Sequence, residues 1–255
     1  MKQYTGDTGQ QLSYITLGGA QNCIFIWAHG WGRSHADFLP LAQSLTTLGT
    51  HYLIDFPGFG QSPRPTQTWG TEQYADFVAE WLDSLPAVPK IWIGHSFGCR
   101  VGLRLAAKHP RLVTALYLIA APGLPKKMSF WQRLQRCLRI CVSKPLKLLL
   151  PACFIEKVKN YVGSADYRSA GNIRDILLAT IEEDLTVVAS HIHCDTYLVY
   201  GELDEETPTE IGRRYHQLLK NSMLVTLPHL NHQSLLTEGR HQILKQLKEL
   251  TSQII

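Results

Sequence analysis

The sequence predicts an α/β protein in which helices cover both faces of a mostly parallel, twisted sheet. Short apolar runs alternate along the chain with stretches of helical periodicity, which is the pattern of strand–helix–strand units. The apolar runs end at loops that contain glycine or proline, where strands commonly end. Hydrophobic residues make up 45% of the 255 residues and charged residues only 18%, so the chain can bury a large core.

Residues 1–123 contain most of the predicted core. The first 22 residues are polar and rich in glycine, and they predict an antiparallel hairpin at the edge of the sheet. Continuous apolar runs predict buried strands at residues 23–28, 51–55, 90–94 and 112–120. Helical periodicity predicts helices at residues 37–48, 71–85 and 97–108. In the second of these, the apolar positions are Tyr74, Phe77, Val78, Trp81 and Leu82.

The alternation stops between residues 124 and 193. This stretch has helical segments broken by Pro145 and Pro151 and no clear strand, and it is far longer than an ordinary connection. The pattern then resumes with strands at 196–200 and 223–227 and helices at 208–220 and 238–250. We therefore predict one α/β core, residues 1–123 and 194–255, interrupted by a helical insertion at residues 124–193.

A candidate nucleophile lies in residues 94–98, which are Gly-His-Ser-Phe-Gly and fit the G-x-S-x-G pattern of a nucleophile elbow. Ser96 follows an apolar strand directly and opens a helix directly. A tight turn of this kind needs small neighbours, which Gly94 and Gly98 provide. The helix start would place backbone N–H groups near developing negative charge. The alternative is a glycine-flanked serine in an ordinary turn.

A carboxylate for the site is predicted in the turn after strand 196–200. A serine nucleophile needs an adjacent base, and a third group must orient that base. Asp204 is the predicted acid, because a short carboxylate in this turn can reach inward. We expect its neighbours Glu202, Glu205 and Glu206 to form a solvated acidic turn at a helix N-terminus.

Two histidines follow the last predicted strand. His232 lies just ahead of the residues that lead into the terminal helix, and it is the predicted base. His229 is expected in the loop, either on the surface or as a support for the site.

Five motifs, in this order, resemble those of the α/β-hydrolase superfamily over almost the whole chain. They are His-Gly-Trp-Gly at 29–32, Asp-Phe-Pro-Gly-Phe-Gly at 55–60, the elbow at Ser96, Gly201 with Asp204 and Pro208, and the late His232. The resemblance implies an α/β-hydrolase fold, with the insertion as a helical cap over the active site. It also implies that the backbone N–H groups of Trp31 and Phe97 form the oxyanion hole. The chain departs from the family at Asn231, where relatives usually have glycine.

The resemblance implies a serine hydrolase that cleaves a carboxylic ester through an acyl-enzyme, with no metal and no organic cofactor. The same triad also supports cleavage of thioesters, amides and carbon–carbon bonds, and a non-catalytic ligand-binding protein that retains the fold stays an alternative. His29 is then a structural residue of the oxyanion loop, and His95 is expected to point away from the nucleophile. On a strand, His191 and His193 would share one side and could begin a metal site, but a structural or surface role is favoured.

Basic residues concentrate in the predicted cap. The net charge of the chain is +4, yet residues 125–160 carry nine basic residues against one acid, Glu156. The nine are Lys126, Lys127, Arg133, Arg136, Arg139, Lys144, Lys147, Lys157 and Lys159. Three interpretations stay open: a solvated face over the pocket, a docking surface for an acidic carrier or substrate, and peripheral contact with an anionic membrane. No recognition motif accompanies the charge, so nucleic acid is not an expected partner.

The docking interpretation has support from a narrower resemblance. Residues 29–32 and 55–60 resemble those of the pimeloyl-carrier-protein methyl ester esterases of biotin synthesis. Those proteins typically have tryptophan where this chain has His95. The expected substrate is therefore a small-molecule ester or a carrier-bound acyl group.

The chain is expected to be cytoplasmic. Its N-terminus has no apolar segment typical of a secretory signal, and no run of about 18 apolar residues predicts a membrane span. Six cysteines have spacings that fit no disulfide framework, so we expect reduced thiols. They are Cys23, Cys99, Cys137, Cys141, Cys153 and Cys194.

Overall fold

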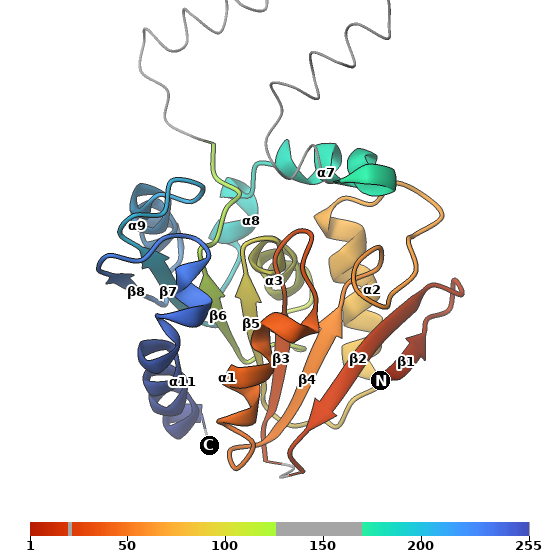
Figure 1. Cartoon of the computed structure of the whole chain (residues 1–255), viewed down its shortest axis with the longest axis horizontal. Helices are drawn as coiled ribbons and strands as arrows, with labels where there is room; N and C mark the ends of the chain where they lie inside the picture. Colours follow the sequence, from red (N-terminus) through yellow and green to blue (C-terminus); the bar gives the residue numbers. More distant parts are fainter. Residues whose placement is uncertain (20–21, 126–169, 255) are drawn as a thin grey trace, which may run out of the picture.

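The centre of the molecule is an eight-stranded, mostly parallel sheet (Figure 1). The computed structural model describes residues 1–19, 22–125 and 170–254. The strands lie in the order β1 (Lys2–Thr5), β2 (Gln11–Leu17), β4 (Thr50–Asp55), β3 (Ile24–Ala28), β5 (Lys90–His95), β6 (Ala115–Ile119), β7 (Asp195–Gly201) and β8 (Ser222–Leu227). Within these residues β2 pairs antiparallel with β1 and β4, and all other neighbours are parallel. The predicted parallel sheet and antiparallel edge hairpin are confirmed.

Helices cover both faces of this sheet, as predicted (Figure 1). One face packs against α2 (Thr71–Asp83), α3 (Phe97–Lys108), α8 (Thr186–Ser190) and α9 (Thr209–Leu218). The other packs against η1 (His35–Phe38), α1 (Leu39–Gln43), α10 (Ser234–Thr237) and α11 (Arg240–Ile254). The short η2 (Gly171–Ile173) and α7 (Arg174–Ile181) lie beyond the ends of the strands.

The central strands are buried on both sides. Every residue of β3, β5 and β6 is buried, which explains why these strands are mostly apolar in the sequence. Successive side chains of a strand point to opposite faces, so Trp92 belongs to the core under α3 and Ile93 to the core under α11. Each fully buried aliphatic side chain contributes about 1.5–3 kcal/mol to folding.

The chain leaves the sheet after β6 and returns to it at β7, and hydrogen bonds hold the start and the end of the intervening segment together. The Leu185 N–H donates to the carbonyl of Gly123 at 2.8 Å, and the Tyr215 hydroxyl donates to the carbonyl of Pro122 at 2.7 Å. Gly123 has a φ of 116°, and a Cβ there would lie 2.7 Å from Leu185. The two ends of the intervening segment are therefore held together at the carboxyl end of β6.

The helix predicted at residues 37–48 is shorter than expected and ends at Gln43. The residues after it form tight turns, in which the Leu48 N–H donates to the carbonyl of Leu45 at 2.9 Å. The chain then passes close to β3, because a Cβ on Gly49 would overlap the carbonyl oxygen of Cys23. The need to enter β4 at this point stops the helix earlier than its periodicity indicates.

The predicted helical insertion is described at residues 124–125 and 170–193. Residues 170–193 carry η2, α7 and α8, so this part is helical as predicted. Residues 126–169, which contain the basic segment and Cys137, Cys141 and Cys153, lie outside the described residues. The division of the chain into core and cap stays a prediction. Among the described helices, none combines the length and apolar character that crossing a bilayer requires.

Candidate active site

Ser96 occupies a strained turn between β5 and α3. Its φ is 47° and its ψ is −105°, a region that side chains rarely adopt. Its N–H donates to the carbonyl of Ile119 at 3.0 Å, which anchors the turn to β6. A Cβ on Gly94 would lie 2.7 Å from the backbone of Gly98, and a Cβ on Gly98 would overlap the carbonyl oxygen of Ala28. The two glycines therefore permit both the turn and the close approach of α3 to β3.

His29 joins the loop after β3 to this turn. Its carbonyl accepts the Gly98 N–H at 3.1 Å. Its Nδ1–H donates to the carbonyl of Gly30 at 2.7 Å, and its Nε2 accepts the Phe56 N–H at 3.1 Å. Burial lowers the pKa of His29, so the ring is neutral in this position. These contacts support the structural role expected for His29.

The two predicted oxyanion donors, Trp31 and Phe97, lie on either side of the contact between the His29 loop and the Ser96 turn. A Cβ on Gly30 would lie 3.6 Å from the Cβ of Ser96, so the loop that carries Trp31 passes beside the serine. The Trp31 and Phe97 rings meet edge to face at 5.6 Å. Within the described part of the chain, neither backbone N–H donates to a protein acceptor. Both amides are therefore available to an oxygen atom of a ligand.

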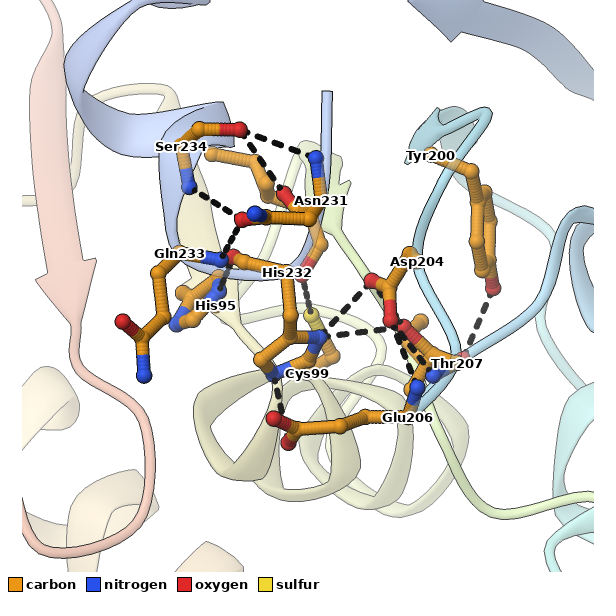
Figure 2. A network of polar contacts seen from close by, with 12 residues as sticks. His95, Cys99, Tyr200, Asp204, Glu206, Thr207, Asn231, His232, Gln233 and Ser234 are labelled. Atoms are coloured by element: carbon orange, nitrogen blue, oxygen red, sulfur yellow. Dashed lines mark hydrogen bonds and ion pairs between the residues drawn. The ribbon is translucent and has the colours of Figure 1, made fainter. Parts of the chain in front are cut away.

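Asp204 and His232 form a hydrogen-bonded pair (Figure 2). The His232 Nδ1–H donates to Asp204 Oδ2 at 2.7 Å. Asp204 also accepts the backbone N–H groups of Glu206 at 2.9 Å and Thr207 at 2.8 Å, and the Thr207 hydroxyl at 2.7 Å. Burial tends to raise the pKa of Asp204, but the His232 and Thr207 hydrogen bonds outweigh it and hold the pKa below its usual value. The carboxylate is thus ionised and fixes the tautomer of the imidazole.

The turns after β7 and β8 bring this pair together. A Cβ on Gly201 would overlap the carbonyl oxygen of Leu230, so glycine allows the two turns to touch. Asn231 then closes the second turn, since its side-chain oxygen accepts the N–H groups of Gln233 at 3.1 Å and Ser234 at 2.9 Å. This capping contact gives a local reason for asparagine where glycine is usual.

One cavity of about 750 Å³ connects these groups. Ser96 and His232 line it together with Gly30, Trp31 and Glu206. The Phe97 side chain does not line it but packs among the aromatic rings near the turn. The volume is in the range of small-molecule sites. The structure thus brings Ser96, His232 and the Trp31 loop to one cavity, with the buried Asp204 bound to the His232 imidazole.

Comparison with known proteins agrees with the fold described above. The family model for the alpha/beta hydrolase fold matches residues 24–139. An esterase from Exiguobacterium antarcticum superposes with a TM-score of 0.75 at 19% identity, covering 98% of each chain. A membrane phospholipase A, a bacterial virulence factor, superposes with a TM-score of 0.76 at 22% identity, covering 97% of this chain and 85% of its own.

The chain is a member of the α/β-hydrolase fold. A curated relative is the pimeloyl-[acyl-carrier protein] methyl ester esterase of Chromobacterium violaceum, which is 26% identical over 237 residues. That alignment covers 85% of this chain and 89% of the relative. Several homologues of the chain are esterases and related hydrolases.

Sequence reasoning missed the position of Glu206 in this α/β hydrolase. Its side chain is exposed in an acidic turn, as predicted, but its Oε2 also lies 3.6 Å from Nε2 of His232 (Figure 2). Glu206 lies two positions after Asp204 in a tight turn, and the sequence alone carries no signal for which way its side chain points.

His95 also lies closer to the site than expected. Its ring centroid is 4.8 Å from that of His232, and its Nε2–H donates to the His232 carbonyl at 3.2 Å. Burial lowers the pKa of His95 to about 3, so the ring is neutral. The residue before the serine therefore supports the loop that carries His232.

A metal site finds no support in the described residues. Among them, no group of three or more histidines, cysteines and carboxylates is placed to hold an ion. His191 and His193 do not lie on a strand, contrary to the alternation considered for them, because α8 extends to Ser190. The His191 Nδ1–H donates to the carbonyl of Val187 at 2.8 Å.

Proposed function

We propose that this α/β hydrolase is a carboxylic ester hydrolase that works through an acyl-enzyme, with Ser96 as nucleophile, His232 as base and Asp204 as the residue that orients the base. One observation carries the proposal. The Asp204–His232 pair, joined at 2.7 Å, opens onto the cavity that Ser96 lines from its strained turn. A ligand-binding protein would need neither this pair nor that turn.

The first step is attack of Ser96 on the ester carbonyl. The Ser96 hydroxyl gives its proton to Nε2 of His232, and Oγ bonds to the carbonyl carbon. The backbone N–H groups of Trp31 and Phe97 stabilise the oxyanion, and the N-terminus of α3 adds positive potential there. The imidazolium then protonates the leaving alcohol, and the acyl group stays on Ser96.

Hydrolysis of the acyl-enzyme completes the cycle. A water molecule gives a proton to Nε2 of His232 as its oxygen attacks the acyl carbonyl. The tetrahedral intermediate collapses, Ser96 recovers the proton, and the acid leaves. Asp204 stays ionised throughout and stabilises the imidazolium.

For the substrate, we propose a small ester or a carrier-bound acyl ester. The Chromobacterium violaceum relative is named for a methyl ester of pimeloyl-[acyl-carrier protein], and its alignment covers most of both chains. The basic segment at 125–160 would suit an acidic carrier, although the structure describes only residue 125 of it. His95 stands where that group typically has tryptophan, and its ring centroid lies 4.8 Å from that of His232.

The decisive experiment is hydrolysis of p-nitrophenyl esters from acetyl to dodecanoyl, compared between the wild type and Ser96→Ala. A pimeloyl methyl ester on its carrier protein is tested in parallel. Ser190→Ala, on the exposed end of α8, is the matched control and should keep full activity. Turnover by the wild type and control but not by Ser96→Ala would support the proposal. Absence of turnover on every ester would refute it and favour a thioester, a carbon–carbon bond or simple ligand binding.

A further inference from the structure

His232 has a carboxylate at each of its two ring nitrogens. Asp204 Oδ2 lies 2.7 Å from Nδ1, and Glu206 Oε2 lies 3.6 Å from Nε2. The first contact belongs to the mechanism above, whereas the mechanism makes no use of the second. Nε2 is the nitrogen that must receive the serine proton, so a negative charge beside it acts on the reacting atom itself.

The turn that holds Asp204 also holds Glu206 in place. The Glu206 N–H donates to Asp204 Oδ1 at 2.9 Å, which fixes the backbone two residues after the acid. From this point the Glu206 side chain runs beneath the imidazole, and its carboxylate faces Nε2 (Figure 2). The side chain is 61% exposed and lines the cavity of Ser96. Water therefore screens its charge in part.

The protonation state of His232 decides whether this contact is favourable. In the neutral ring, Nδ1 carries the proton shared with Asp204, and Nε2 presents a lone pair to Glu206, which is repulsive. In the imidazolium, Nε2 carries a proton that can point at Glu206, which is attractive. Glu206 therefore favours the imidazolium over the neutral ring, and this difference raises the pKa of His232.

The other charged groups near the ring do not duplicate this effect. Asp204 contacts the opposite nitrogen. His95 packs on the ring at 4.8 Å but stays neutral because burial lowers its pKa to about 3. Asp37, which also lines the cavity, is paired with Arg33 at 2.7 Å. Glu238 also lines the cavity.

We propose that Glu206 is an electrostatic partner of His232 that sets the pH at which the hydrolase becomes active and stabilises the imidazolium formed during acyl transfer. Glu206 neither accepts nor donates a proton in the reaction. This proposal rests on the role of His232 as base. It makes Glu206 a positioning residue, whose effect is visible in the pH profile.

The test compares Glu206→Gln with Glu205→Gln. Both variants remove one negative charge from the same turn, but the Glu205 side chain is exposed and is not among the residues that contact His232 or line the cavity. For two charges about 4 Å apart near water, the acid limb of the kcat/KM profile should move down by about 0.5–1 pH unit in Glu206→Gln. At pH values below the acid limb, kcat/KM of Glu206→Gln should be about three- to tenfold higher than that of the wild type. On the plateau it should be about two- to threefold lower, because His232 is then a weaker base. Glu206→Asp should give an intermediate shift.

Two further measurements separate this proposal from the proposed function. The pKa of His232 is measured by NMR of the imidazole in the free protein, which needs no substrate. A lower His232 pKa in Glu206→Gln than in Glu205→Gln supports the inference even if no ester is hydrolysed. The difference should shrink between about 0.02 M and about 0.5 M NaCl, because Glu206 is exposed. Equal His232 pKa values in the two variants, or an unchanged kcat/KM profile in Glu206→Gln, would overturn the proposal.

Discussion

The backbone N–H of Gly98 donates to the carbonyl oxygen of His29 at 3.1 Å, and this bond joins the first turn of α3 to the loop that follows β3. The two segments are far apart in the sequence, yet one carries Ser96 and the other Trp31. This main-chain contact, together with the pairing of β3 with β5, therefore holds the proposed nucleophile and one proposed oxyanion donor in register. Any change that pushes α3 away from β3 would separate them.

Gly98→Ala tests this contact. The new Cβ would overlap the carbonyl oxygen of Ala28, so the helix or the strand must move. We expect a loss of about 1–3 kcal/mol or more in the free energy of unfolding, measured with urea, and a large loss of esterase activity. Gly19→Ala is the control, since a Cβ there meets no atom within 4 Å. Equal stability of the two variants would contradict the close approach of α3 to β3.

The strain at Ser96 predicts an unusual order of stability. Glycine ordinarily lowers stability relative to alanine, because it has more freedom in the unfolded chain. At a φ of 47° this order should reverse, with Ser96→Gly more stable than Ser96→Ala by about 1 kcal/mol. Thermal unfolding of the two inactive variants measures the difference. A more stable alanine variant would show that the turn relaxes without strain.

Asp204→Asn should lower kcat by about 10³–10⁴-fold, because the amide no longer selects the Nδ1–H tautomer of His232. The pH dependence of stability offers a second readout. The folded pKa of Asp204 lies below its usual 3.8, so the carboxylate stabilises the fold above that value and loses its contribution as the pH falls through the folded pKa. The stability difference between wild type and variant should therefore shrink on acidification. A difference that is constant with pH would argue against an ionised Asp204.

His51 predicts acid sensitivity away from the cavity. Its Nδ1 accepts from the Trp27 indole at 3.0 Å and its Nε2–H donates to Leu45 at 2.9 Å, and burial lowers its pKa from 6.5 to about 4. The neutral ring stabilises the fold above 6.5, and this contribution is lost as the pH falls toward about 4. His51→Gln should reduce the loss of stability over that range by about 1–3 kcal/mol. His241→Gln, on the exposed side of α11, should leave the loss unchanged in the same urea titrations.

The fold could be predicted from the sequence because its strands are buried on both faces. Such strands are mostly apolar and end beside glycine, so the positions of β3 and β5 follow from the residues themselves. The candidate site follows from the same pattern, since Asp204 and His232 were found by their places after β7 and β8. Helix ends were less predictable, because Gln43 ends α1 only where a tertiary contact at Gly49 requires it.

Side-chain directions in the turns could not be predicted. The contact of Glu206 with His232 depends on a backbone bond to Asp204 that no periodicity encodes. The position of His95 against the His232 loop depends on how the turn after β8 returns over the end of β5. Both contacts with the His232 loop are set by tertiary structure, where the turns after β5, β7 and β8 meet.

The hydrogen bond between Leu185 and Gly123 has an evolutionary consequence. Because a main-chain bond fixes both ends of the segment that leaves after β6, residues added to or removed from it need not disturb the sheet. The segment can therefore change in size or charge without moving the turns around Ser96, Asp204 and His232. Selection can therefore change which ligands reach Ser96 without altering the turns that surround it.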